Sequence, residues 1–201
     1  MSNYFLYLCD MKNRLPYEMT SKAIKGYSNS AIAKGETKDC VVRAFASSFE
    51  IPYDVAHEYV ATHFNRKPRC GTFGTSLKLV KMANEEVVVN QKKVYLVGYR
   101  FTPSMFGTLS YDVKVKGEVK KRNMTVGTFI KKNPIGTFFV IVSGHAFTIK
   151  DGVVIGNYED SVKIKRVMKC AFEIKWYFKI CIVKQSYEKY TTLVLVIDII
   201  F

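Results

Sequence analysis

The chain has 201 residues, of which 48% are hydrophobic and 24% are charged, a composition that suits one globular domain able to bury a core. Its formal net charge of +14 leaves a nucleic acid or an acidic protein open as a partner. The five cysteines contain no Cys-x-x-Cys pair, and neither a signal peptide nor a long apolar run is evident, so we expect a cytoplasmic protein with no disulfide framework, membrane span, metal or cofactor.

The first half of the chain is predicted to be helical after an irregular N-terminal segment over residues 1–36. Residues 39–49 are predicted as the first helix, because their apolar residues recur at helical spacing and Thr37 or Asp39 can cap the start. Further helices are predicted over residues 52–63 and 75–84.

The second half is predicted to be mainly β structure. Residues 87–101 have the pattern of strands, residues 102–123 are expected to be irregular, and Thr125 can cap a short helix that ends before Pro134. The remaining strands are predicted over residues 137–142, 145–149, 153–157, 162–168 and 171–182. Helices that precede strands favour an α+β fold, which we expect to be a single domain over residues 1–201 with a helical part (37–90) and a mainly β part (91–201).

Cys40 stands at the start of the first predicted helix. A helix N-terminus presents unpaired N–H groups and the positive end of the helix dipole, and both stabilise a thiolate, which is the nucleophilic form of cysteine. His145, at the start of a later strand, can serve as the base. The two residues together predict thiolate attack on a carbonyl group, with the backbone N–H of Cys40 donating to the oxyanion.

The hairpin that follows His145 decides which side chain orients the imidazole. With a three-residue loop over residues 150–152, the apolar residues of both strands pair on one face and His145 lies opposite Asn157. In that register Asn157 hydrogen-bonds one ring nitrogen and leaves the other for Cys40. If the register slips, Asp160 is the alternative orienting residue.

Two motifs resemble the papain-like cysteine peptidase superfamily, and in particular its small phage-encoded and bacterial members. The motifs are Asp39-Cys40-x-x-Arg43-Ala44 and Gly144-His145-Ala146 followed by Asp151-Gly152. The resemblance implies a papain-like fold, in which an N-terminal helical layer packs on a C-terminal antiparallel sheet. It also implies a hydrolase with a protein or peptide substrate, acting in the host cytoplasm if the protein is phage-encoded. By the same resemblance Cys40 is the nucleophile, His145 the base and Asn157 the orienting amide.

The resemblance further implies a glutamine shortly before the nucleophile as a second oxyanion donor, but residues 31–39 contain neither Gln nor Asn. Thr37, Asp39 and Arg43 are the candidates for an oxyanion or supporting role, and Arg43 can instead pair with Asp39. Two alternatives therefore stay open. One is a catalytically degenerate papain-like protein that binds a host or defence factor through its basic surface, and the other is a nucleic-acid-binding protein.

Overall fold

The computed structural model describes residues 14–83, 87–89, 92–99, 108–176, 179–187 and 190–198, and it confirms a mixed α+β architecture. Its helical elements are α2 (Thr20–Ala23), the 3-10 helix η1 (Tyr27–Asn29), α3 (Ala31–Gly35), α4 (Cys40–Ser48), α5 (Tyr53–His63), α6 (Thr75–Ala83), α7 (Val126–Lys132) and α8 (Tyr158–Val162). Its strands are β1 (Tyr17–Met19), β2 (Val87–Val89), β3 (Lys92–Tyr99), β4 (Ser110–Val115), β5 (Glu118–Asn123), β6 (Thr137–Val142), β7 (His145–Lys150), β8 (Val153–Gly156), β9 (Met168–Trp176), β10 (Lys179–Tyr187) and β11 (Tyr190–Asp198). No helix in the described part of the chain combines the length and apolarity that a membrane crossing needs.

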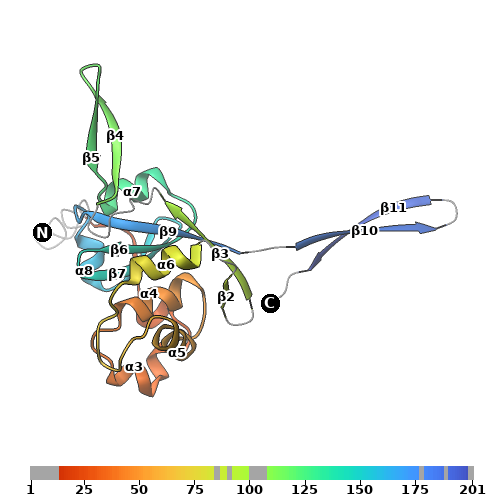
Figure 1. Cartoon of the computed structure of the whole chain (residues 1–201), viewed down its shortest axis with the longest axis horizontal. Helices are drawn as coiled ribbons and strands as arrows, with labels where there is room; N and C mark the ends of the chain where they lie inside the picture. Colours follow the sequence, from red (N-terminus) through yellow and green to blue (C-terminus); the bar gives the residue numbers. More distant parts are fainter. Residues whose placement is uncertain are drawn as a thin grey trace, which may run out of the picture.

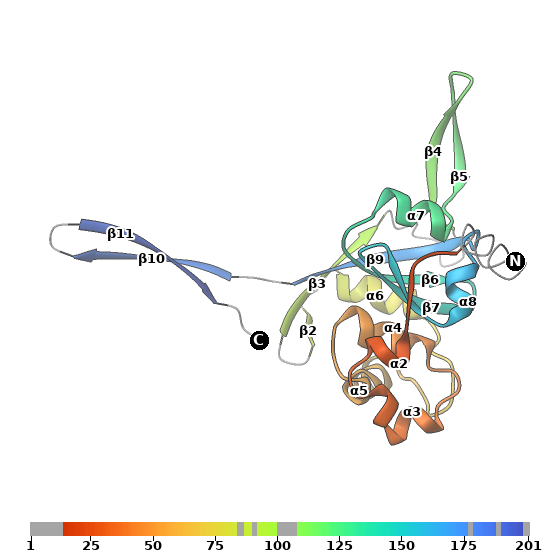
Figure 2. The ribbon, with the colours of Figure 1, turned by 180° about the vertical axis from the view of Figure 1, so that it is seen from behind.

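A seven-stranded sheet forms the centre of the fold, with the strand order β1-β8-β7-β6-β9-β3-β2. Neighbouring strands are antiparallel except at the edge, where β1 runs parallel to β8. Helices α3 to α6 lie on one side of this sheet and α7 on the other, as both views show (Figures 1 and 2). Two hairpins, β4–β5 and β10–β11, stand outside the sheet.

Both faces of the sheet are covered by buried apolar side chains. Phe45 of α4 belongs to the core between the helices and the sheet, together with Phe139 of β6. Phe138, the preceding residue, belongs to the core on the opposite face, where its ring meets that of Phe129 of α7 at a centroid distance of 5.0 Å. Because side chains alternate along a strand, these two neighbours enter different cores. Buried side chains therefore pack against both faces of the sheet, and this packing also fixes β7, the strand that begins with His145.

Helix α4 lies close against β7 because small and hydroxyl-bearing side chains meet between them. The hydroxyl oxygens of Ser47 and Thr148 are 2.7 Å apart, and Thr148 donates to the backbone carbonyl of Ala44 at 2.9 Å. Both hydroxyl residues are buried, so these contacts satisfy groups that would be costly to leave unpaired. They join the helix that begins with Cys40 to the strand that begins with His145.

The β7–β8 hairpin has a two-residue turn, so the three-residue loop expected from apolar pairing is wrong. Lys150 pairs directly with Val153. The turn residues Asp151 and Gly152 both have positive φ, 48° and 78°. This is the type I′ geometry, whose twist matches that of antiparallel strands and which Asp-Gly sequences favour. The shift by one residue separates the first residue of β7 from Asn157, which lies beyond β8.

The predicted helices over 39–49, 52–63 and 75–84 and the strand over 137–142 are confirmed, and three other segments differ from expectation. Residues 102–123, expected to be irregular, include the β4–β5 hairpin. Half-buried and exposed residues alternate along β4, whereas β5 is exposed throughout and has no apolar alternation. Residues 162–168, expected to be a strand, are mostly the end of α8 and a turn closed by backbone hydrogen bonds. Residues 1–36 contain β1, α2, η1 and α3 in their described part, while predictions for residues 1–13, 84, 90–91, 100–107 and 177–178 lie outside the described residues.

Candidate active site

Cys40 is the first residue of α4, and its side chain is half-buried. Asp39 precedes it at the cap position, but its carboxylate makes no cap hydrogen bond. Instead it forms an ion pair with Arg43 Nε at 3.0 Å and accepts a hydrogen bond from the Tyr53 hydroxyl at 2.8 Å. The carboxylate therefore leaves the helix N-terminus to the thiol, and Arg43 compensates a negative charge that would otherwise oppose a thiolate.

His145 is positioned by the turn between β6 and β7 and by a buried carboxylate. Gly144 has φ of 68°, a conformation that favours glycine and closes the turn directly before the histidine. The Nε2 atom of His145 lies 3.0 Å from Oδ1 and 3.1 Å from Oδ2 of Asp160, whose side chain is only 3% exposed. Because Nε2 is held in this way, Nδ1 is the ring nitrogen left to bond the thiol of Cys40.

The electrostatics of the pair favour a thiolate and an imidazolium. Burial raises the pKa of the Cys40 thiol, but the hydrogen bonds from His145 and from the backbone N–H of Ala146 outweigh it, so that the pKa lies below its usual value. Burial lowers the pKa of His145, whereas the Asp160 carboxylate and Cys40 raise it to about 9. Both shifts point to the ionised pair, which is the reactive state of a cysteine nucleophile.

Asn157 makes no hydrogen bond to His145, which corrects the orienting role expected for it. Its side-chain oxygen accepts a hydrogen bond from Arg43 Nη1 at 2.7 Å, and its backbone N–H donates to Asp160 Oδ2 at 2.9 Å. The cause is that the register of the β7–β8 hairpin differs by one residue from the expected register, which places Asn157 at the cap of α8. Asp160, the alternative named from the sequence, lies against the imidazole in its place.

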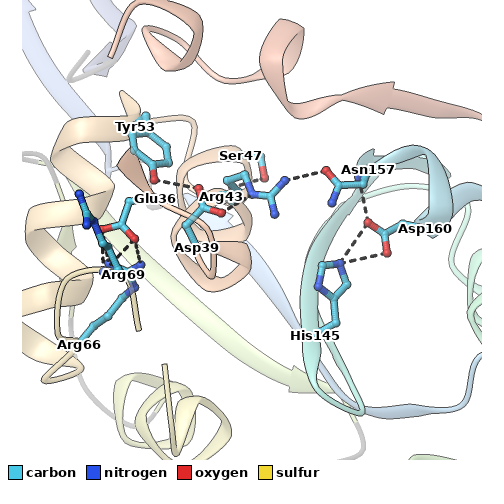
Figure 3. Close-up of polar contacts among 10 residues, drawn as sticks. All are labelled: Glu36, Asp39, Arg43, Ser47, Tyr53, Arg66, Arg69, His145, Asn157 and Asp160. Carbon is cyan, nitrogen blue, oxygen red and sulfur yellow. Dashed lines mark hydrogen bonds and ion pairs between the residues drawn. The ribbon is translucent and has the colours of Figure 1, made fainter. Parts of the chain in front are cut away.

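These contacts form a continuous chain around the site (Figure 3). Arg43 on α4 reaches Asn157, Asn157 is joined to Asp160 through its backbone N–H, and Asp160 holds His145. Arg43, Asn157 and Asp160 therefore link α4, the helix that begins with Cys40, to the imidazole of His145.

Of the other residues expected near an oxyanion, Thr37 is exposed and lies before α4. Asp39 cannot donate while ionised, and its contacts give it a supporting role. Arg43 was expected either to support the oxyanion site or to pair with Asp39, and the structure shows the ion pair with Asp39. The backbone N–H of Cys40 at the helix N-terminus is therefore the oxyanion donor that the geometry supports.

A second polar cluster fixes the chain just before Cys40. Glu36 pairs with the buried Arg66 at 2.6 Å and accepts the backbone N–H of Arg69 at 3.1 Å (Figure 3). It also contacts His57 Nε2 at 3.0 Å. The hydrogen bond from Arg66 is the main reason why the pKa of Glu36 falls to about 2. Sequence reasoning missed this cluster, because its members are scattered over the chain and carry no motif.

The residues around the thiol line a small pocket between α4 and the β7–β8 hairpin. Besides the polar residues already described, its walls are formed by Thr20, Ala44, Ala146, Phe147, Ile155 and Gly156.

Within the described residues there is no group of three His, Cys, Asp or Glu side chains that could hold a metal ion. One signal for Asp160 was present in the sequence, since an Asn cap followed by an acid three residues later is a helix-start pattern.

No protein-family model, curated protein or solved structure matches this chain.

Proposed function

We propose that this protein is a cysteine hydrolase of the papain-like type, which cleaves an amide bond in a peptide or isopeptide substrate. The observation that carries the proposal is the pairing of Cys40, at a helix N-terminus, with an imidazole whose far nitrogen is held by Asp160. The architecture gives further support, because α4 packs across the antiparallel strands from which His145 projects.

The proposed reaction has two steps. The thiolate of Cys40 attacks the substrate carbonyl carbon, and the negative charge on its oxygen is stabilised by the N–H of Cys40. The Nδ1 proton of the His145 imidazolium passes to the leaving amine, so that the C–N bond breaks and a thioester remains. The neutral imidazole then takes a proton from water, whose oxygen attacks the thioester carbonyl; the C–S bond breaks, the acid is released, and the thiolate and the imidazolium are restored. Asp160 stabilises the imidazolium in the first step and keeps the ring in place.

A catalytically degenerate protein of the same fold is the second candidate. It is favoured by the lack of a side-chain amide over residues 31–39, since one oxyanion donor contributes on the order of 100-fold or more in rate. Asn29, the nearest amide before Cys40 in the sequence, is exposed and belongs to η1.

The alkylation rates of the individual cysteines test the nucleophile. We expect iodoacetamide at pH 6 to modify Cys40 faster than Cys70, although Cys70 is the more exposed of the two. Cys170 should react slowest, because burial raises its thiol pKa to about 12. Replacing His145 by glutamine should remove the advantage of Cys40. Equal rates for Cys40 and Cys70 would contradict the proposal.

Hydrolysis needs its own measurement. Incubation with a mixed peptide library should give new termini that are absent with the Cys40→Ala variant. Selective alkylation of Cys40 without Cys40-dependent cleavage of peptides or isopeptide-linked conjugates would instead support the degenerate binding protein.

A further inference from the structure

The hairpin β4–β5 is a second functional candidate, which lies apart from the thiol site. We define the basic ribbon as residues 110–123, the two strands and their turn. It stands out from the body of the molecule beside α7 in both views (Figures 1 and 2). An isolated two-stranded hairpin is marginally stable and buries little, so its presence calls for a reason other than core formation.

The ribbon is strongly cationic along its whole length. Its exposed cations are Lys114, Lys116, Lys120, Lys121 and Arg122. Its two acidic residues are Asp112 and Glu118. Among the acidic residues that the structure describes, only Glu118 forms an ion pair with a ribbon cation. Its partner is Lys120, at 3.3 Å, and both side chains are exposed. Two more exposed lysines, Lys131 and Lys132, end the adjoining helix α7.

The cations are divided between the two faces of the ribbon. Residues directly opposite each other across an antiparallel pair share a face, and the faces alternate along each strand. Arg122, opposite Tyr111, and Lys120 therefore lie on one face. Lys121 and Lys114 lie on the other. The turn itself carries Lys116.

The base of the ribbon is fixed to the core. Leu109 and Met124, which flank its two strands, are fully buried and joined by a backbone hydrogen bond of 2.7 Å. The Nζ atom of Lys132 lies 5.0 Å from the ring centroid of Tyr111 at the foot of the ribbon. The ribbon is thus presented by buried anchors at both strand ends.

We propose that the basic ribbon binds duplex nucleic acid by entering a groove. A strand of six residues spans about 20 Å, and a two-stranded ribbon fits the major groove, which is about 12 Å wide. Cations on both faces match the two phosphate backbones that flank a groove. A flat acidic protein or an anionic membrane would be met by one face only, and the Lys116-Gly117 turn has no apolar side chain to insert into a membrane.

The test compares two variants with the same loss of charge. The ribbon variant replaces Lys114, Lys120, Lys121 and Arg122 by glutamine. The control variant replaces Lys22, Lys34, Lys67 and Lys81 by glutamine; these four lysines are exposed and belong to the helical part of the chain that precedes β2. Binding of a labelled DNA duplex of about 20 base pairs, roughly two helical turns, is followed by fluorescence anisotropy.

If four phosphates are contacted, the logarithm of the association constant should fall with the logarithm of salt concentration at a slope of about −3.6, or about 150-fold between roughly 50 and 200 mM. The ribbon variant should lose most of this slope and at least about tenfold in affinity at the lower salt concentration, while the control variant keeps the slope. Equal losses in both variants would overturn the proposal, because net charge alone would then explain binding.

Two further outcomes would also overturn it. One is no duplex binding by the wild-type protein at the lowest salt concentration. The other is ribbon-dependent binding to vesicles of equimolar phosphatidylcholine and phosphatidylserine without duplex binding, which would assign the surface to a membrane. None of these readouts depends on Cys40.

Discussion

Replacing Asp160 by asparagine removes the charge that faces His145 while nearly preserving the shape of the side chain. The two side chains are mostly buried, at 18% and 3% exposure, and the imidazole Nε2 lies 3.0 Å from the carboxylate. Without that charge, burial should draw the pKa of His145 down from about 9 toward its ordinary value of 6.5. A charge-assisted hydrogen bond of this kind contributes about 2 kcal/mol, which is about 30-fold in the ratio of the ionised to the neutral Cys40–His145 pair.

The assay is the pH dependence of Cys40 alkylation by iodoacetamide, resolved by peptide mass spectrometry. For Asp160→Asn we expect the rate near pH 6 to fall by about 30-fold and the profile to move up by about 1.5 pH units. The matched control is Glu159→Gln, which removes the same charge from the same helix at an exposed residue paired with Lys163. Thermal melting reports whether both variants fold. A profile for Asp160→Asn that superimposes on that of Glu159→Gln would refute the reasoning.

Three further substitutions test the surroundings of the thiol and the stability of the fold. In Gly156→Ala the new Cβ would lie 2.6 Å from Asp160 Oδ2, so the carboxylate must move. We therefore expect alkylation of the Cys40 thiol to slow about tenfold. The control is Gly35→Ala, whose Cβ would meet nothing within 4 Å and which should leave the rate unchanged. Arg43→Gln leaves the neighbouring carboxylate uncompensated, and the alkylation profile should shift to higher pH; a lower melting temperature with an unchanged profile would instead make Arg43 purely structural. The folded-state pKa of Glu36, about 2, is below the ordinary value of 4.5, so its charge stabilises the fold above pH 4.5 and this contribution is lost as the pH falls toward 2. Glu36→Gln should therefore lower the free energy of unfolding in urea by about 3 kcal/mol at pH 7 and by progressively less between pH 4.5 and 2, whereas a difference independent of pH would contradict this account.

The chemistry of the candidate nucleophile was accessible from the sequence because it depends on local structure. The apolar spacing in residues 39–49 predicts a helix, and a helix start at Cys40 brings its own N–H groups and dipole to the thiol. The strand over residues 137–142 and the Asp-Gly turn were likewise predictable from short windows. Each of these features is determined by residues that are neighbours in the chain.

The exposed hairpin shows where such windows fail. Strand β5 is exposed on both sides, so the alternation that identifies a strand, one buried face and one polar face, is missing from its sequence. Strand β4 alternates between half-buried and exposed residues, but it is only six residues long and has no partner strand that a short window could identify. The dense cations of this segment were visible in the sequence, but their division between two faces follows only from the pairing of the strands.

The residue that orients the imidazole was decided by the tertiary structure. Apolar pairing favoured Asn157, whereas the positive φ of both turn residues shifts the register by one and leaves Asp160, on the first turn of α8, against His145. The close approach of α4 to β7 has the same origin, because Ser47 and Thr148 meet only after about a hundred intervening residues have folded. Sequence alone thus determined which groups can do the chemistry, since reactivity follows from side-chain type and local helix geometry. Only the folded chain decided which of them touch, since register and packing are properties of segments distant in sequence.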